Sequence, residues 1–326
     1  MNFLLNLIRG VLENVMEEKS LRIDIINWGK LSWVNVENPG RDEMDYLARH
    51  FNFHPLDLDD CLSKIQRPKI DEYPDYLFMV LHFPVFDKRM RVTQPSQVSI
   101  FLGDDFLVTV HKGDLKPIVN FFKECKANET AREEYMGSSA SFLLYTILDR
   151  LVNYCFPILN KIGENIEKVE DMIFGDQMEK AIREIALLRR DVIHYRRIIK
   201  PQTEVFEHLE KNGSKYTFLK EAPHVYFGDL ADHCRKIQDT LEDYREVIEG
   251  FKDTNDTLAS FRINQVMRIL TVISTIMLPL TLIASIYGMN VPLPGQGSPY
   301  FFPLFILFSI FLIGAMLFIF RKRRWI

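Results

Sequence analysis

The sequence predicts an N-terminal α/β domain, long helices after it, and two transmembrane helices at the C-terminal end. From Ile269 to Phe320 the chain has no Asp, Glu, Lys or Arg, and this stretch holds two apolar segments, Ile269–Ile286 and Tyr300–Phe320. Each segment has about the 20 residues that a helix needs to cross a hydrocarbon core. Upstream, a mixture of strand-like and helix-like patterns gives way after about residue 130 to helical patterns alone.

The first domain, residues 1–130, is expected to be cytoplasmic and of mixed α/β structure. A strand-forming run breaks at Gly103, which suits a hairpin and excludes a purely parallel sheet. Met1–Ser20 is expected to form an amphipathic helix and no signal peptide, because charged residues interrupt its apolar patch. The predicted elements are the strands Leu31–Val36, Tyr76–Phe86 and Gln97–His111 and the helices Arg41–Phe51 and Leu115–Lys126.

Residues 131–222 are predicted to form a helical hairpin. Apolar residues recur three and four apart from Leu144 to Ile173, which predicts one long helix. Phe174–Asp176 interrupts this pattern, and a second helix is predicted from about Gln177 to Lys200, where Pro201 would end it. A short break between two amphipathic helices favours an antiparallel pair.

Residues 223–268 are predicted to form a long stalk helix that continues into the first span. No proline lies between Pro223 and Pro279, and a heptad-like apolar stripe starts near Asp229. Such a helix would link a soluble domain mechanically to the membrane. The remaining segments are a transmembrane helix (269–290), an extracellular loop (291–299), a second transmembrane helix (300–320) and a basic tail (321–326).

The positive charges that flank the spans predict their orientation. Arg262 and Arg268 precede the first span and Arg321–Arg324 follows the second, whereas the loop carries no Lys or Arg. Because Lys and Arg remain on the cytoplasmic side, we expect both termini inside and the protein in the cell membrane. Two spans cannot enclose an aqueous pathway alone, so transport would require an oligomer in the lipid bilayer.

Composition and motifs argue against several other functions. The formal net charge is −4, which does not favour a nucleic-acid partner. The chain lacks the GxxxxGK[ST] loop that binds nucleotide phosphates, and its four cysteines form no CxxC pair. No nucleophile motif or catalytic metal-ligand spacing occurs in the soluble part. We therefore expect neither an enzyme nor an ATP-driven pump.

The first span closes on the motif Tyr287-Gly288-Met289-Asn290, which resembles that of the CorA family of magnesium channels. The similarity extends to Met277–Ile286 and, in the soluble part, to Phe53–Asp60, Gln66–Pro68 and Tyr226–Asp229. It implies a homopentameric funnel that admits Mg²⁺, with Co²⁺ as a second candidate ion. Many CorA proteins have an acidic residue in the loop after the motif, but Val291–Pro299 has none, so this loop is not expected to concentrate cations.

One face of the first span is predicted to line the ion pathway. Its residues recur three and four apart, with hydroxyl groups toward the outside and large apolar groups toward the cytoplasm: Met267, Leu270, Ser274, Leu278, Thr281 and Ser285. The apolar members could gate the path by dewetting. Alternatively, the small residues only allow close helix packing. The second span is rich in phenylalanine throughout, which suits lipid contact.

The motif residues are the candidate selectivity filter. Mg²⁺ holds its water tightly, and the spans offer no carboxylate to replace that water. A ring of Asn290 amide oxygens, with backbone carbonyls near Gly288, could instead accept hydrogen bonds from the hydrated ion. Tyr287 would pack behind this ring. A neutral ring binds weakly enough to release the ion again.

The resemblance matches Asp60 and Asp229 to carboxylates that bind regulatory Mg²⁺ between neighbouring cytoplasmic domains. Facing carboxylates repel unless a cation bridges them, so internal Mg²⁺ would hold the subunits closed and its loss would let them separate. The residues alone favour another role, because aspartates near a helix start are usually caps or dipole partners.

Two other functions remain open. The first is a transporter of the same architecture for cobalt, nickel or zinc; Met289 favours magnesium or cobalt, since zinc-transporting CorA-like proteins usually differ at this position. The second is a membrane-tethered sensor without transport, in which the spans serve only as an anchor.

Overall fold

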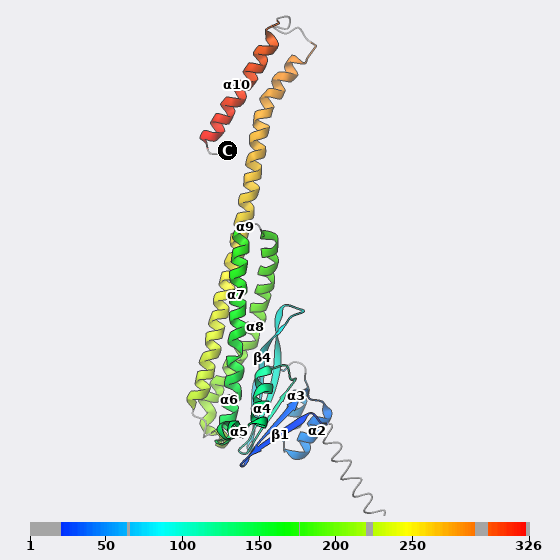
Figure 1. Cartoon of the computed structure of the whole chain (residues 1–326), viewed down its shortest axis with the longest axis vertical. Helices are drawn as coiled ribbons and strands as arrows, with labels where there is room; N and C mark the ends of the chain where they lie inside the picture. Colours follow the sequence, from blue (N-terminus) through cyan, green and yellow to red (C-terminus); the bar gives the residue numbers. More distant parts are fainter. Residues whose placement is uncertain (1–20, 64–65, 176, 220–223, 291–298, 324–326) are drawn as a thin grey trace, which may run out of the picture. The chain divides into compact units, whose positions relative to one another are not determined.

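A mixed sheet of six strands forms the centre of the N-terminal part of the chain (Figure 1). The computed structural model describes residues 21–63, 66–175, 177–219, 224–290 and 299–323, in two units, Met1–Phe251 and Lys252–Ile326. The strand order is β1-β2-β6-β5-β4-β3; β2 and β6 are parallel and the other neighbours antiparallel. The strands are β1 (Ile23–Trp28), β2 (Leu31–Glu37), β3 (Lys69–Glu72), β4 (Leu77–Asp87), β5 (Val92–Leu102) and β6 (Phe106–His111).

The mixed sheet and its hairpin at Gly103 confirm the predicted α/β class, but the sequence analysis missed parts of it. β1 and β3 were not predicted, and β5 begins at Val92 instead of Gln97. Both missed strands lie at the edges of the sheet, and most of their residues are exposed or only half-buried. An edge strand needs few apolar residues, so its sequence pattern is weak.

Helices cover both faces of the sheet (Figure 1). On one face, α2 and α3 enclose a core with Val34, Phe78 and Phe101. On the other, α8 packs against β4 and β5, α6 against β5 and β6, and the Trp33 ring lies 4.9 Å from that of Phe122 on α4. The helices of this unit include α2 (Arg41–His50), α3 (Pro55–Leu62), α4 (Lys116–Ala127), α5 (Glu129–Met136), α6 (Ala140–Asn153), α7 (Cys155–Phe174) and α8 (Met178–Asn212), followed by the short 3₁₀ turns η1 (Gly213–Lys215) and η2 (Thr217–Leu219).

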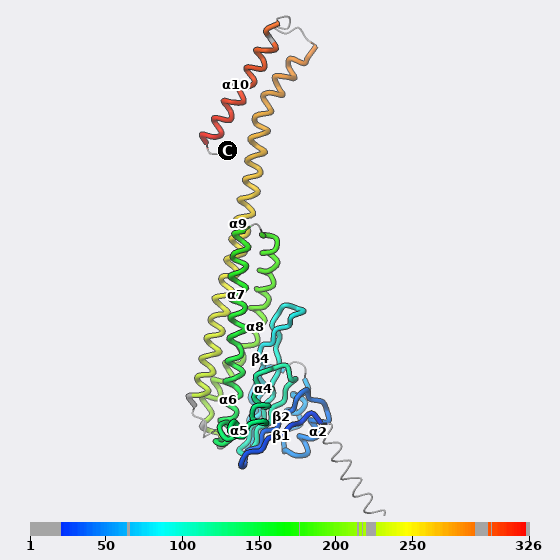
Figure 2. The backbone as a smooth tube through the Cα atoms, viewed as in Figure 1, coloured from blue at the N-terminus to red at the C-terminus, as the bar shows by residue number. Residues whose placement is uncertain are grey.

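The predicted helical hairpin is present, but its first helix is divided. α7 and α8 lie side by side (Figure 2), and the Tyr195 hydroxyl donates a hydrogen bond of 2.6 Å to the Cys155 carbonyl. The single helix predicted through Leu144–Ile173 is instead α6 and α7, separated at Tyr154. Pro157 has no N–H for the Asn153 carbonyl, which accounts for the break at this point. The apolar stripe nevertheless continues through both helices.

The prediction that Pro201 ends the second helix is wrong, because α8 continues through it to Asn212. Packing on both sides outweighs the missing hydrogen bond: Ile198, Ile199 and Phe206 are buried. The buried Gln202 side chain donates to the carbonyls of His82 and Ile198, at 2.7 and 3.2 Å. A proline inside a helix costs about 3 kcal/mol, which such tertiary contacts offset.

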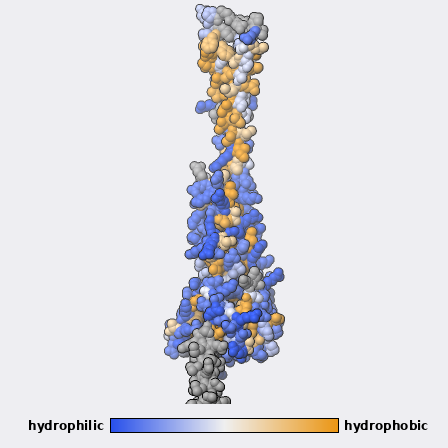
Figure 3. Space-filling model, turned by 90° about the vertical axis from the view of Figure 1, so that its right-hand side faces the viewer, coloured by the Kyte–Doolittle hydropathy of each residue, from blue (hydrophilic) through white to orange (hydrophobic). Residues whose placement is uncertain are grey.

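The predicted uninterrupted helix is confirmed as α9, which runs from His224 to Tyr287 and is followed by α10 (Phe301–Lys322). By length and composition, three described helical segments could cross a membrane, and α9 and α10 provide two of them. The third, Ala140–Phe174, has 44% of its most apolar window buried within the structure, where it packs against the sheet and α8. Apolar residues dominate the visible face of the second unit, in contrast to the first (Figure 3).

A buried polar chain crosses from β2 to β6. Trp33 Nε1 donates to Thr109 Oγ1, which donates to Asn35 Oδ1, and His111 Nε2 lies 2.9 Å from the same oxygen. Because His111 Nδ1 accepts a hydrogen bond from the Gly113 N–H, the neutral ring must carry its proton on Nε2. Burial lowers the pKa of His111 to about 4.

This arrangement predicts a loss of stability in mild acid. The unfolded chain, with a histidine pKa near 6.5, takes up a proton more readily than the folded chain, so stability falls as the pH drops from about 6.5 toward 4. For His111 the loss approaches about 3 kcal/mol. Thermal unfolding of the detergent-solubilised chain at several pH values should show this slope, and His111→Gln should flatten it relative to the parent. An unchanged slope in the variant would contradict the assignment.

Candidate permeation path and cation-binding residues

The C-terminal part of α9 has two unlike faces. Tyr287 lies beside α10, with its ring edge-to-face at 6.4 Å from that of Phe305, and an apolar groove between the helices includes Ile283 and Phe308. Val272 is buried, and other α9 residues that share this side by helical period are half-buried: Ile276, Pro279, Leu280 and Ile283. This face of α9 is therefore the one that packs on α10.

The residues predicted to line a pathway occupy the opposite face. At 100° per residue their directions cluster about half a turn from the packed stripe. All six are exposed, with Met267, Leu270 and Leu278 at 55, 56 and 69%. In the described part of the chain no element covers this face, so another molecule or water must lie against it.

The motif residues follow the same division. Tyr287 is the last residue of α9 and belongs to the packed face, behind the exposed stripe. Gly288 continues the exposed stripe by period, and its N–H bonds to the Ala284 carbonyl at 2.9 Å. Met289 N–H reaches the Ile286 carbonyl at 3.3 Å, so the helix closes with a turn, and Asn290 follows it, exposed.

Polar groups on the exposed face of α9 are neutral oxygens. Thr281 Oγ1 donates to the Met277 carbonyl at 2.8 Å, which leaves its lone pairs free to accept. With the Ser274 and Ser285 hydroxyls and the Asn290 amide, this face offers acceptors for water bound to a cation but no carboxylate to displace that water.

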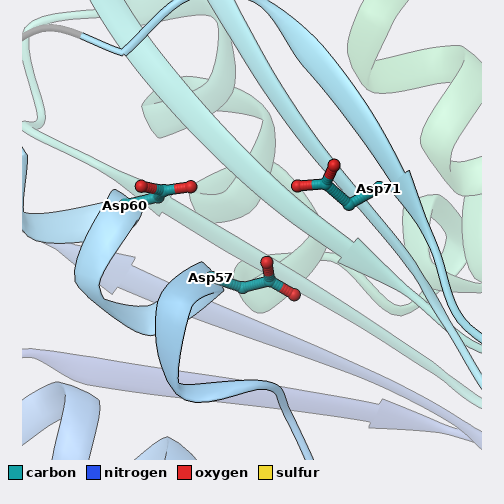
Figure 4. A group of neighbouring side chains, drawn as sticks. All are labelled: Asp57, Asp60 and Asp71. Atoms are coloured by element: carbon teal, nitrogen blue, oxygen red, sulfur yellow. The ribbon is translucent and has the colours of Figure 1, made fainter.

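Three carboxylates of the first unit lie close together. Asp57 and Asp60, one turn apart on α3, and Asp71 on β3 point toward a common space (Figure 4), with one oxygen of each within 4.8 Å of the others. We call these residues the carboxylate cluster. Two unit charges at that separation repel by about 3 kcal/mol at an effective dielectric constant near 20, so the cluster needs compensation.

Two tyrosine hydroxyls stabilise the carboxylate of Asp57. Its side chain is buried and accepts hydrogen bonds from the hydroxyls of Tyr76 and Tyr73, at 2.9 and 3.2 Å. Burial raises the pKa of Asp57, and these hydrogen bonds offset the effect only in part. The Tyr76 hydroxyl also accepts from the His54 N–H at 2.8 Å, which fixes the start of α3 against β4.

A lysine offsets the negative charge of Asp60. Lys69 Nζ lies 2.7 Å from Asp60 Oδ2 and also pairs with Asp71, while Gln66 Nε2 donates to Asp60 Oδ1 at 2.5 Å. Burial alone would lower the pKa of Lys69, but the hydrogen bonds to Asp60 and Asp71 outweigh it and raise that pKa, so the ammonium stays charged. Asp60 lies in the last turn of α3, where the helix dipole disfavours a negative charge.

The second predicted regulatory residue lies in another environment. Asp229 is exposed, and its Oδ1 is 3.9 Å from His233 Nε2, one turn along α9. Asp149 on α6 is electrostatically coupled to both; burial raises its pKa, the His233 charge lowers it and the Asp229 charge raises it. α9 begins at His224, so Asp229 lies in its second turn and is no N-cap.

Within one chain, therefore, Asp60 and Asp229 belong to separate groups of residues. Sequence reasoning missed Lys69 and Asp71, although both follow the Gln66–Pro68 segment that drew attention to this region. It also missed Asp149, for which the sequence gives no signal because the residue belongs to no motif.

Comparisons with known proteins agree over nearly the whole chain. Residues 28–322 match a family described as CorA-like Mg²⁺ transporter protein. The chain is 30% identical to the cobalt/magnesium transport protein CorA of Thermotoga maritima over 299 residues, which cover 90% of this chain and 83% of that protein. It is 31% identical to the putative metal ion transporter YfjQ of Bacillus subtilis over 280 residues, 86% of this chain and 83% of that protein.

The fold agrees with a solved structure of similar size. The complete CorA magnesium transporter from Methanocaldococcus jannaschii superposes with a TM-score of 0.80 and 25% sequence identity. The match covers 93% of this chain and 94% of the other. The α/β part, the long helices and the C-terminal apolar helix therefore occur together in one known architecture.

Proposed function

This chain belongs to the CorA-like Mg²⁺ transporter family, whose members are divalent cation transporters of membranes, and we propose that it forms a homopentameric channel for passive Mg²⁺ influx. An inside-negative potential favours entry of a divalent ion by about 4.6 kcal/mol per 100 mV. This gradient suffices to drive the ion inward, and the sequence has no nucleotide-binding loop to suggest another energy source.

The observation that carries the proposal is the uncovered face of α9, which bears three hydroxyl groups. Its exposed stripe lies opposite the face that packs on α10, so copies of α9 can converge on an axis while each α10 remains outside, against lipid. Two helices cannot seal a water path, whereas a ring of them can. In this arrangement Ser274, Thr281 and Ser285 face the water, and Met267, Leu270 and Leu278 form the cytoplasmic constriction that closes by dewetting.

The filter in this proposal is the ring of Asn290 side chains. Their amide oxygens accept hydrogen bonds from the water shell of Mg²⁺, with help from the backbone near Gly288. Tyr287, packed toward Phe305, supports the ring from behind. Since no carboxylate is present, the ion keeps its water and leaves again easily.

The proposed topology has two spans, residues 269–290 and 300–320, with both termini in the cytoplasm. The basic residues at Arg262, Arg268 and Arg321–Arg324 support this orientation. The Ala140–Phe174 segment, which is apolar enough to be a third span, is assigned to the cytoplasmic part because its apolar stripe already packs against other helices and the sheet. The cytoplasmic part then divides into segments 1–130, 131–222 and 223–268.

We further propose that cytoplasmic Mg²⁺ closes the channel by bridging subunits through Asp60 and Asp229. The exposed Asp229 carboxylate is available to a neighbouring subunit, and cations bound between facing carboxylates relieve their repulsion. α9 carries the response, because it continues without a break from the segment that holds Asp229 to the proposed filter.

Co²⁺ is a second candidate substrate. The relative in Thermotoga maritima is named for cobalt as well as magnesium, and a filter that contacts only the water shell distinguishes poorly between hydrated divalent ions. Nickel or zinc transport by the same architecture is the less favoured alternative, since Met289 keeps the form of the motif associated with magnesium and cobalt.

The pathway is tested by replacing the filter amide. In liposomes loaded with a Mg²⁺-sensitive dye, Asn290→Ala should lower Mg²⁺ uptake about tenfold or more, because each lost acceptor contributes about 1 kcal/mol. The same assay with Co²⁺ identifies the second substrate. The matched control is Phe311→Leu on α10, which should preserve uptake. Equal uptake by the parent and Asn290→Ala proteins would refute the proposed filter.

Gating is tested at Asp229. Asp229→Asn removes the charge but keeps the shape, so closure should require a cytoplasmic Mg²⁺ concentration higher by about fivefold or more. Asp232→Asn, three residues further along the exposed part of α9, is the control and should leave the closing concentration unchanged. Channel current in patches with varied internal Mg²⁺ gives the measurement; equal sensitivity of the parent and Asp229→Asn proteins would exclude Asp229 as a sensor.

A further inference from the structure

The carboxylate cluster already contains a cation, the ammonium group of Lys69. Its nitrogen lies 2.7 Å from Asp60 Oδ2 and pairs with Asp71 as well. The ring of buried Phe78 supports the same nitrogen from a second side, with 5.4 Å between Nζ and the ring centroid. The lysine is thus held in place by charge and by an aromatic face.

The chain geometry explains why this particular lysine reaches the cluster. Lys69 and Asp71 are two residues apart on β3, so their side chains leave the strand on the same side. α3 presents Asp60 to that side, and only 33% of the Lys69 side chain and 16% of the Asp60 side chain remain exposed. The pair is consequently a partly enclosed contact, in contrast to the mobile ion pairs of an open surface.

Without this ammonium the same oxygens would suit a divalent cation. Carboxylate oxygens from three residues would face one another within 4.8 Å. Mg²⁺ usually binds through one or two carboxylates and keeps several waters, and Co²⁺ accepts the same oxygen ligands. The donor set is therefore compatible with a metal, but Lys69 supplies the positive charge instead.

We propose that Lys69 is a tethered cation that prevents Asp57, Asp60 and Asp71 of one subunit from binding a divalent ion among themselves. Loss of its charge turns the cluster into a Mg²⁺- and Co²⁺-binding site within a single subunit. This inference concerns cation binding by the folded chain and does not rest on the proposed transport.

The test compares metal-dependent stability of full-length variants in detergent. Lys69→Met removes the ammonium and keeps most of the side-chain volume. The matched control, Lys126→Met, breaks the exposed pair of Lys126 with Asp24, in which the two atoms are 2.5 Å apart. Each protein is freed of metal with a chelator and then titrated with Mg²⁺ or Co²⁺ while its unfolding temperature is measured.

Without metal, Lys69→Met should unfold at a lower temperature than the parent protein. At roughly 100 times the dissociation constant, metal should raise its unfolding temperature by about 5 °C more than that of the parent or of Lys126→Met. Isothermal titration should find one more Co²⁺ bound per chain than in the parent. Adding Asp71→Asn to Lys69→Met should abolish this extra response, since a cluster ligand is lost.

A metal response in Lys69→Met equal to that of the parent protein would overturn the proposal. An extra response that survives Asp71→Asn would overturn it too, because the metal would then bind elsewhere. If Lys69→Met does not fold without metal, Lys69→Gln, which keeps a hydrogen-bond donor but no charge, takes its place in the same comparison. Failure of the transport test would leave this result unaffected. Failure of the metal-binding test would equally leave the proposed transport unaffected.

Discussion

Hydrocarbon offers no partner to a backbone polar group or to an ion, and this constraint decides how the C-terminal part of the chain must be organised. α9 and α10 satisfy their own backbones as helices, yet a pair of helices leaves no water-filled space between them. The groove between them is apolar and aromatic, with Ile283, Tyr287 and Phe305 in its lining. The hydroxyl-bearing stripe of α9 lies on the other side, so any aqueous path has to form where copies of this stripe meet.

The carboxylates of the first unit also need nearby groups that offset their charge. The carboxylate cluster is stabilised from within its own subunit, by a hydrogen bond from Tyr76 to Asp57 and by the Lys69 ammonium between Asp60 and Asp71. Asp229, by contrast, is exposed, and within the described residues its charge partner is His233, at 3.9 Å. A bridge between subunits is therefore expected to depend more on Asp229 than on Asp60, whose two oxygens already have partners in the same chain.

The sequence allowed the α/β class, the helical hairpin and the continuous α9 to be predicted, because each depends on a period repeated over many residues. It misplaced the features that depend on tertiary contacts. Pro201 was expected to end α8, but buried neighbours such as Phe206 and the Gln202 side chain hold the helix together beyond it. β1 and β3 were missed because edge strands need little apolar sequence.

The candidate residues show the same difference. The stripe on α9 was predicted by period alone, since a long helix fixes which side chains share a face. Lys69 and Asp71 could not be joined to Asp60 in this way, because their proximity depends on how β3 packs beside α3. Asp149 belongs to no motif, and only its position relative to His233 and Asp229 distinguishes it.

The central claim is that one face of α9 meets water while the opposite face meets α10. Cysteines introduced singly at Ser274 and Thr281, on the exposed stripe, and at Ile276 and Leu280, on the packed side, test it through their reaction with a water-soluble thiol reagent during Mg²⁺ uptake. The native cysteines give little background, because all four are buried. Modification and block should occur at Ser274 and Thr281 and spare Ile276 and Leu280. Equal reaction on both faces, or reaction on the packed face alone, would contradict the account.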